Sequence, residues 1–365
     1  MKWEILGETT GGTTRHLSIT QTRCGGSVSF RGVLEHRPYS ATASSLPNQL
    51  DADKLSGMST KILKRVPRVT LNVIKVFHGA EYDWLPHLEA VTTVLSMHSP
   101  EALLGNIASA SRTGTAKVDD SCHPNNVQAH PDFEFLILHS IWFDILACVS
   151  VGRVPRIEYR QWLEKPTLNL EMADLMGCYN WVMISIGDLA HLRGWGTAMK
   201  AKGALSVPQL VRRTQEIEAR LHDGIHELES TIKGDTEILP ATWVSLIFAL
   251  ASLVLSNTLA SGPLASLPEI RETVGKAVKV LRSWPQTIPL HGLVWALCII
   301  GCMAESEHQP FLETLLANFA EECRGLGNAR TVLKVVKDYW AAQELQHQRN
   351  SMNLEFMVEV RALFI

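Results

Sequence analysis

The sequence predicts an all-α fold, a multi-helix bundle of roughly a dozen helices that follows a disordered N-terminal tail. The first observation is that apolar residues recur three and four positions apart from about residue 61 onward. The second is that strand-type alternation is nearly absent. The third is size and composition, because 365 residues that are 46% hydrophobic can bury one large core or two smaller ones. We therefore expect a disordered or weakly structured segment over 1–60 and a helical domain over 61–365.

The N-terminal segment is rich in Gly, Ser and Thr, as in Thr9–Thr14 and Ser40–Ser45, and shows little periodicity. Such composition is typical of disorder. The stretch Thr9–Leu34 has three arginines and no acidic residue, which is also a property of mitochondrial transit peptides. Its amphipathic period is poor, so the disordered tail is the preferred interpretation.

Helical spacing begins with the stripe Trp84, Leu88, Val91 and Leu95, which predicts a helix from near Asp83. A second helix is expected to open at Pro131 and to carry a wide apolar face as far as Val149. The sequence Val151–Pro155 then predicts a break, because Gly ends helices and Pro disfavours helical geometry in the residue before it. The next helix is expected from about Glu171 to Arg193, ending at Gly194.

Ser206–Gln209 reads as a helix cap with Pro208 in the first turn, opening a more polar helix with a narrow apolar seam. Further helices are expected at about 241–260, 269–284, 290–304, 309–324 and 328–348. The longest apolar run, Trp243–Leu255, is shorter than the ~20 residues that span a bilayer. We expect it to be a buried core helix, and we expect no membrane association.

The net charge of −3 provides no general basic field for phosphate contacts, so DNA binding would require a local patch. The seven cysteines show no disulfide spacing and are expected to be reduced thiols. The chain has no N-glycosylation sequon, and its first thirty residues lack the apolar stretch of a secretory signal. These features favour an intracellular protein.

No residue pattern predicts a catalytic, cofactor-binding or metal site. His222 and His226 are superficially similar to a zinc protease helix, but Asp223 replaces the required glutamate and no third ligand is indicated. Cys298 and Cys302 lie in an apolar run, where thiols usually act as small buried hydrophobes. The pair Cys122-His123 is too few ligands for a tetrahedral site.

Three charged residues, Asp144, Arg153 and Asp188, stand in apolar surroundings. They predict an internal ion pair, with effector binding as the alternative. The segment Lys61–Arg68 concentrates four cations, which indicates either a solvated helix flank or a nuclear import signal. The tryptophans on helix faces predict core packing first and a ligand pocket second.

Four segments match a known pattern in the right order: Trp84–Ala90, Phe143–Pro155, Leu175–Ala190, and Pro289 through Trp340. The first two resemble the patterns Trp-x-x-His-Leu-x-x-Ala and Asp-x-x-x-Ser-x-x-Gly-Arg-x-Pro, with small differences in spacing. The other two contain a Gly-Cys with the later Ile-x-Asp-Leu-Ala, and a Gly-Cys-x-Ala helix end before a Gly-x-x-Asn cap. Over about residues 68–365 the chain resembles the C-terminal regulatory domain of fungus-specific transcription factors of the binuclear zinc-cluster type.

The resemblance implies a nuclear regulator of a metabolic or secondary-metabolite gene set. The implied partners are a second copy of the chain, the transcription machinery or another regulator, and a small-molecule effector whose contact residues the sequence does not identify. The family's zinc cluster needs six clustered cysteines, whereas only Cys24 precedes Cys122 here. Direct DNA binding is therefore not expected. The alternatives are a co-regulator that acts only through protein contacts, and an all-α enzyme with a Trp-lined pocket for an apolar substrate.

Overall fold

The computed structural model divides into two compact units, Met1–Ile74 and Lys75–Ile365. It describes residues 2–9, 14–23, 26–35, 85–101, 131–234, 238–322 and 328–347. The cation segment Lys61–Arg68, the pair Cys122-His123 and the residues Cys24 and Trp84 lie outside the described residues.

The N-terminal unit contains a three-stranded antiparallel sheet in the order β1-β2-β3. Its strands are β1 (Lys2–Thr9), β2 (Thr14–Arg23) and β3 (Gly26–Glu35). The register pairs Ile5 with Ile19, and Ile19 in turn with Phe30. This sheet differs from the disordered tail that the sequence predicts.

The signal for these strands is short alternations such as Trp3 and Ile5 or Leu17 and Ile19, with a polar residue between each pair. A period of two fits a strand, and only two residues separate Arg23 from its register partner Gly26, as in a tight hairpin. Each alternation is only a few residues long, so the strand signal is weak. The high content of Gly, Ser and Thr around it favours a prediction of disorder instead.

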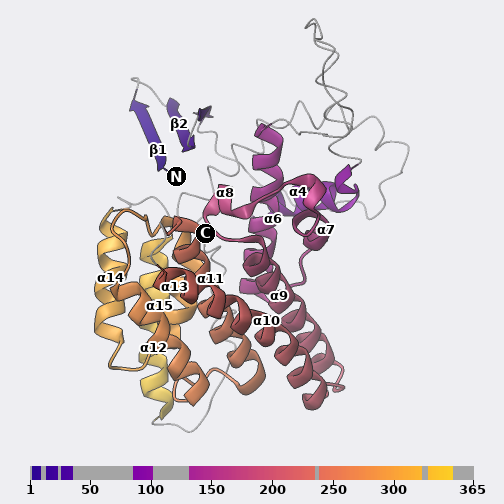
Figure 1. Ribbon diagram of the computed structural model, residues 1–365, viewed down its shortest axis with the longest axis vertical. Helices are drawn as coiled ribbons and strands as arrows, with labels where there is room; N and C mark the ends of the chain where they lie inside the picture. The colour runs from indigo at the N-terminus through magenta and orange to yellow at the C-terminus, as the bar shows by residue number, and fades with distance from the viewer. Residues whose placement is uncertain are drawn as a thin grey trace, which may run out of the picture. The chain divides into compact units, whose positions relative to one another are not determined.

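The described residues of the second unit are mainly helical, which confirms the all-α prediction for them (Figure 1). Its described residues form eleven α-helices: α4 (Leu85–Ser96), α6 (Pro131–Val151), α7 (Tyr159–Leu163), α8 (Met172–Met176), α9 (Asn180–Ala201), α10 (Val207–Lys233), α11 (Pro240–Ser261), α12 (Pro268–Arg282), α13 (Val294–Cys302), α14 (Gln309–Glu322) and α15 (Ala329–His347). Two short 3₁₀ helices, η1 (Pro166–Leu168) and η2 (His291–Leu293), connect them.

Helix α11 lies at the centre of the helical unit and contacts α9, α10, α12 and α13 (Figure 1). Phe248 is fully buried, and its ring stacks on that of Trp295 in α13 with centroids 5.9 Å apart. The buried hydroxyl of Ser252 donates to the Phe248 carbonyl oxygen at 2.7 Å, so it needs no partner outside the helix. The centre of the bundle is therefore apolar, and the Ser252 hydroxyl within it is satisfied by its own helix.

By length and composition, two stretches within the described part of the chain could cross a membrane: Glu134–Val151 in α6 and Pro240–Ser261, which is α11. Most of their residues are buried inside the helical unit, including Ile141 and Ile145 of α6 and Leu250 of α11. The core helix of a globular domain has the same length and composition. The core helix predicted from the run Trp243–Leu255 is confirmed.

Most predicted helix boundaries agree with the structure within a few residues, and the cap at Ser206 is confirmed because its hydroxyl accepts the N–H of Gln209 at 3.4 Å. The single helix predicted from Glu171 to Arg193 is wrong. Gly177 adopts a left-handed conformation, with φ of 78°, and divides it into α8 and α9.

The predicted end at Gly194 is also wrong, because α9 continues to Ala201. A Cβ at Gly194 would lie 2.5 Å from Cγ2 of Val154. This glycine therefore permits close packing and does not end the helix, a distinction that local propensity cannot make.

A similar close contact joins α9 to α10. A Cβ at Gly224 would lie 2.3 Å from Cη2 of Trp181, so the indole ring packs against the bare backbone of α10. By contrast, a Cβ at Gly196 in α9 would meet no atom within 4 Å. The two helical glycines therefore differ in their surroundings.

Replacing Gly224 with alanine should lower the free energy of unfolding by about 1–3 kcal/mol, because the added methyl group must displace Trp181. The matched control, Gly196→Ala, should raise it by about 0.5–1 kcal/mol, since alanine favours the helix and the space is open. Urea titrations followed by tryptophan fluorescence measure both values. Equal effects of the two substitutions would contradict the close packing of Trp181 on α10.

Candidate functional site

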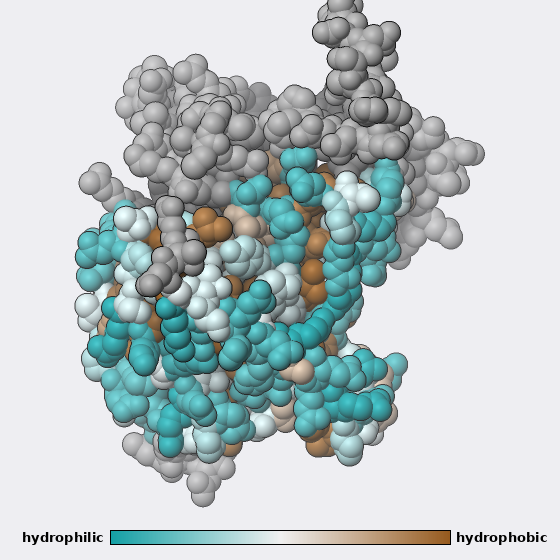
Figure 2. All heavy atoms as spheres, in the orientation of Figure 1, coloured by the Kyte–Doolittle hydropathy of each residue, from teal (hydrophilic) through white to brown (hydrophobic). Residues whose placement is uncertain are grey.

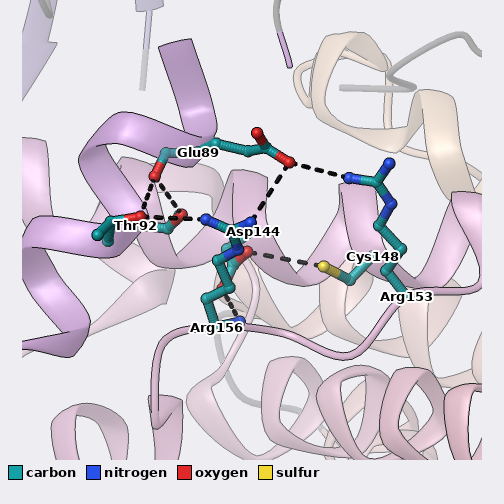
Figure 3. A network of polar contacts seen from close by, with 7 residues as sticks. Glu89, Thr92, Asp144, Cys148, Arg153 and Arg156 are labelled. Carbon is teal, nitrogen blue, oxygen red and sulfur yellow. Dashed lines mark hydrogen bonds and ion pairs between the residues drawn. The ribbon is translucent and has the colours of Figure 1, made fainter. Parts of the chain in front are cut away.

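The carboxylate of Asp144 anchors the connection between α6 and α7 (Figure 3). It is buried on α6, and its Oδ2 atom accepts the backbone N–H groups of Arg156 at 2.8 Å and Ile157 at 2.9 Å. The Cys148 thiol lies 3.6 Å from Oδ1. Burial raises the pKa of Asp144, and the two amide bonds offset this only in part. These bonds hold the chain that leaves α6 against the side of that helix.

A second, outer layer of charges joins α4 to the same connection (Figure 3). Glu89 of α4 accepts from Arg153 at 3.1 Å and from Arg156 at 3.4 Å. Arg156 also donates to the Thr93 hydroxyl at 3.1 Å. These side chains are about 40–50% exposed, so water screens the ion pairs and each contributes at most about 1 kcal/mol.

Arg193 of α9 caps the C-terminal end of α6. Its Nη1 atom donates to the carbonyl oxygens of Val149 at 2.5 Å and Ser150 at 3.2 Å. A cation at this end of a helix satisfies free carbonyl groups and interacts favourably with the helix dipole. Gly152 follows with a φ of 72° and leaves room for the guanidinium beside it.

Asp188 of α9 is the acceptor for a second polar cluster. It accepts the Tyr159 hydroxyl at 2.9 Å and the Arg160 guanidinium at 2.5 Å, both from α7, and it also pairs with Arg220 of α10. Its side chain is only 15% exposed. One carboxylate therefore connects three helices.

The glycine next to Asp188 makes this cluster possible. A Cβ at Gly187 would lie 2.5 Å from Cζ of Tyr159, so the phenol ring can reach Asp188 only because residue 187 has no side chain. Burial, together with the nearby Asp188 carboxylate, raises the pKa of Tyr159. The phenol therefore stays protonated and acts as a hydrogen-bond donor.

Two residues at the start of α9 connect it to the rest of the bundle. The Asn180 side chain donates to the carbonyl oxygens of Leu163 and Leu170 at 3.0 and 2.8 Å and accepts the Met172 N–H at 2.8 Å. The Tyr179 N–H donates to the Ser245 hydroxyl of α11 at 2.8 Å. The loops around α7 and α8 are thus fixed by side chains that satisfy buried backbone groups.

The chemistry of this region favours structural connection over catalysis. Burial raises the pKa of Cys148 and Cys178, so both thiols stay protonated and are poor nucleophiles. Among the described residues, no three His, Cys, Asp or Glu side chains come together to hold a metal ion. His222 and His226 are exposed on α10.

The three charged residues singled out from the sequence do not pair with one another. Asp144 binds backbone N–H groups, Asp188 binds two arginines, and Arg153 is exposed and pairs with Glu89. Of the three, Asp188 forms ion pairs with its side chain largely but not fully buried, and both of its arginine partners are more exposed. Sequence reasoning missed Tyr159, Arg160, Asn180, Arg193 and Arg220, because their roles depend on which helices meet.

Comparison with known protein families identifies the domain. The model of the fungal specific transcription factor domain matches residues 4–362, which is nearly the whole chain. The chain belongs to this family. No solved structure matches it significantly.

Relatives of this fungal transcription factor domain are named as regulators of biosynthesis. The chain is 30% identical over 203 residues to the trichothecene biosynthesis transcription regulator of Trichoderma arundinaceum, covering 55% of this chain and 46% of that protein. The corresponding regulator of Fusarium sporotrichioides is 25% identical over 282 residues (73% and 64%). The ustiloxin B cluster transcription factor of Aspergillus flavus is 29% identical over 215 residues (55% and 36%). Each match covers less than two thirds of the relative.

The motifs that carry the family resemblance coincide with the contacts described above. Asp144 and Asp188 are the acidic residues of two of these segments, and each organises a polar cluster. In the last segment, the Trp340 indole of α15 donates to the carbonyl oxygen of Gly301 in α13 at 2.8 Å. A Cβ at Gly301 would lie 2.9 Å from Cγ2 of Val336. In this chain, these residues of the recognised segments fix one element of the helical unit against another.

Replacing Asp144 with alanine should lower the free energy of unfolding by about 3 kcal/mol, because the N–H groups of Arg156 and Ile157 lose their shared acceptor. Asp144→Asn should cost under about 1 kcal/mol, since the amide oxygen can still accept both bonds and no charge is buried. Urea unfolding followed by fluorescence measures both.

The control is Glu89→Ala, which removes only exposed ion pairs and should cost under about 1 kcal/mol. If Asp144→Asn were as damaging as Asp144→Ala, the negative charge would hold this connection and the hydrogen-bond explanation would be rejected.

Proposed function

We propose that this chain is the regulatory part of a transcription regulator that acts in the nucleus and controls a secondary-metabolite biosynthetic gene set. The family match over residues 4–362 carries the proposal. The names of the relatives support it, since they refer to regulation of trichothecene biosynthesis and of the ustiloxin B and pestheic acid clusters. The proposed role is regulatory and not catalytic.

The proposed mechanism is a shift between two packings of the helices. Asp188 links α7, α9 and α10, and Asp144 links α6 to the segment before α7. A change at one helix is therefore transmitted to its neighbours through a small number of directional bonds. A ligand or partner can shift such an equilibrium only if it binds the two packings with different affinity.

We do not assign DNA reading to this helical unit. A binuclear zinc cluster needs six clustered cysteines, and this chain has one cysteine before Cys122. We propose that the unit influences transcription through contacts with other proteins, such as another regulator or the transcription machinery. Specific binding of the purified chain to promoter DNA at physiological salt would contradict this part of the proposal.

Deleting the gene in its host should change the transcripts of one biosynthetic gene set, and reintroducing a fluorescently tagged wild-type copy should restore them. RNA sequencing and microscopy measure expression and nuclear accumulation together.

A copy with Lys61, Lys64, Arg65 and Arg68 changed to alanine tests nuclear import, with Lys279→Ala as the control for loss of an exposed cation. An unchanged set of transcripts after deletion would overturn the proposed function, and unchanged nuclear entry would reject the import signal.

We further propose that the chain forms a homodimer and responds to a small metabolite of the pathway it controls. Sedimentation equilibrium should give a mass of about twice that of one chain. A pathway metabolite should raise the melting temperature, because a ligand that binds only the folded state stabilises it. A monomer at all concentrations would reject the dimer, and uniformly flat thermal responses to the pathway's metabolites would reject the effector.

A further inference from the structure

The end of the hairpin formed by α9 and α10 is strongly basic. From Leu189 to Gln215 the sequence contains five Lys or Arg residues and no Asp or Glu, although the whole chain has a net charge of −3. The Arg193 side chain is not available for a partner, because it donates to the Val149 carbonyl oxygen at the end of α6. The other four cations are exposed and lie on both sides of the turn: Lys200, Lys202, Arg212 and Arg213. This local patch carries a charge of about +4 at neutral pH.

The apolar seam of α10 continues into this basic region without cover. From Thr214 through Ile217 and Leu221 to Leu228, the residues of the seam are buried. One turn and two turns before Thr214, the same face presents Val211, which is 36% exposed, and Val207, which is 61% exposed. Two branched apolar side chains therefore face solvent on one side of the helix, where the neighbouring helices no longer cover it.

An aromatic ring adds to this surface. The Arg213 guanidinium lies over the half-buried Trp195 ring of α9, 4.6 Å from its centroid, which holds this cation in place. Figure 1 shows the joined ends of α9 and α10 at the lower right of the helical unit, and Figure 2 shows brown spheres among teal ones there. We call Trp195, Lys200, Lys202, Val207, Val211, Arg212 and Arg213 the hairpin surface.

We propose that the hairpin surface is a docking site for an acidic amphipathic helix of a partner protein. Valines 207 and 211 would contact the apolar stripe of that helix, and the surrounding cations would pair with its Asp and Glu side chains. Helices with an apolar stripe bind to exposed apolar helix faces at i, i+3, i+4 and i+7 spacing, and complementary charge accelerates association and fixes orientation.

Two other ligands, a second copy of this chain and a DNA duplex, fit the hairpin surface less well in charge or in apolar contacts. A second copy of the same surface would bring about eight positive charges together, which is unfavourable at low dielectric. A DNA duplex would satisfy the cations through its phosphates, but it would leave Val207 and Val211 without apolar contacts. The combination of exposed valines and exposed cations favours a ligand that is both acidic and apolar.

This inference goes beyond the proposed function, because the hairpin surface does not include Asp144 or Asp188. Its test is a binding measurement on the purified chain, so it can fail independently of the gene-deletion experiment. The probe is a fluorescent synthetic peptide of about 20 residues with Leu at helical spacing and Asp or Glu elsewhere. Fluorescence anisotropy with the full chain should show saturable binding that weakens with added salt. A scrambled peptide of the same composition should bind at least about tenfold more weakly.

Two double variants separate the apolar and charged contributions. Val207→Ser with Val211→Ser and Lys202→Glu with Arg212→Glu should each weaken binding of the probe at least about tenfold. Lys279→Glu on α12, an exposed charge reversal elsewhere, should leave the affinity unchanged. Circular dichroism should show unchanged melting for all variants, because the substituted side chains are exposed.

Three results would overturn the proposal: no saturable binding of the probe, equal binding of the scrambled peptide, or equal weakening by Lys279→Glu. A random DNA duplex of about 20 base pairs serves as the competing ligand. Tighter binding of DNA than of the probe, lost on charge reversal but insensitive to the valine variants, would instead identify a nucleic-acid surface and reject the helix-docking proposal.

Discussion

The burial of one apolar helix is the constraint on which the helical unit depends. Helix α11 has almost no polar face, and four other helices cover it. Burying such a helix on all sides provides a large hydrophobic contribution, about 25 cal/mol for each Å² of apolar surface removed from water. Two of its buried hydroxyl groups are satisfied, that of Ser252 within the helix and that of Ser245 by the N–H of Tyr179. Of the helices around it, α10 and α12 are amphipathic, with one buried face and one exposed face, whereas α13 is buried along its whole length.

Hydrophobic burial has little directional preference, so it does not by itself determine how the outer helices are placed. The polar anchors supply that direction. Asp144, Asp188 and Asn180 each bond to groups outside their own helix. Glycines 187, 194 and 224 allow a tyrosine, a valine and a tryptophan to approach the backbone closely. These positions include the acidic residues and a glycine of the segments that carry the resemblance to fungal transcription factor domains.

The same architecture is suited to regulation. In the proposed mechanism, a small set of directional bonds between helices would separate one packing from another, since a buried carboxylate without its partners is costly. The hairpin of α9 and α10 links the Asp188 cluster to the exposed hairpin surface, because α9 carries Asp188 and α10 carries its partner Arg220. A partner that docks at the far end of these two helices would therefore act on elements that also belong to the Asp188 cluster.

The sequence by itself determined the helical class of the described residues between 85 and 347, the order and approximate limits of most of their helices, the buried character of α11 and the family resemblance. Periodicity and helix-capping residues are local properties, and they are sufficient for these conclusions. Tertiary structure decided the rest. Whether Gly194 ends a helix or packs beneath Val154, and whether Asp188 meets Arg160 or Arg153, depends on distances between segments far apart in sequence. The sheet over residues 2–35 also depends on pairing between strands, since each short strand has only a weak signal until its neighbours supply the hydrogen bonds.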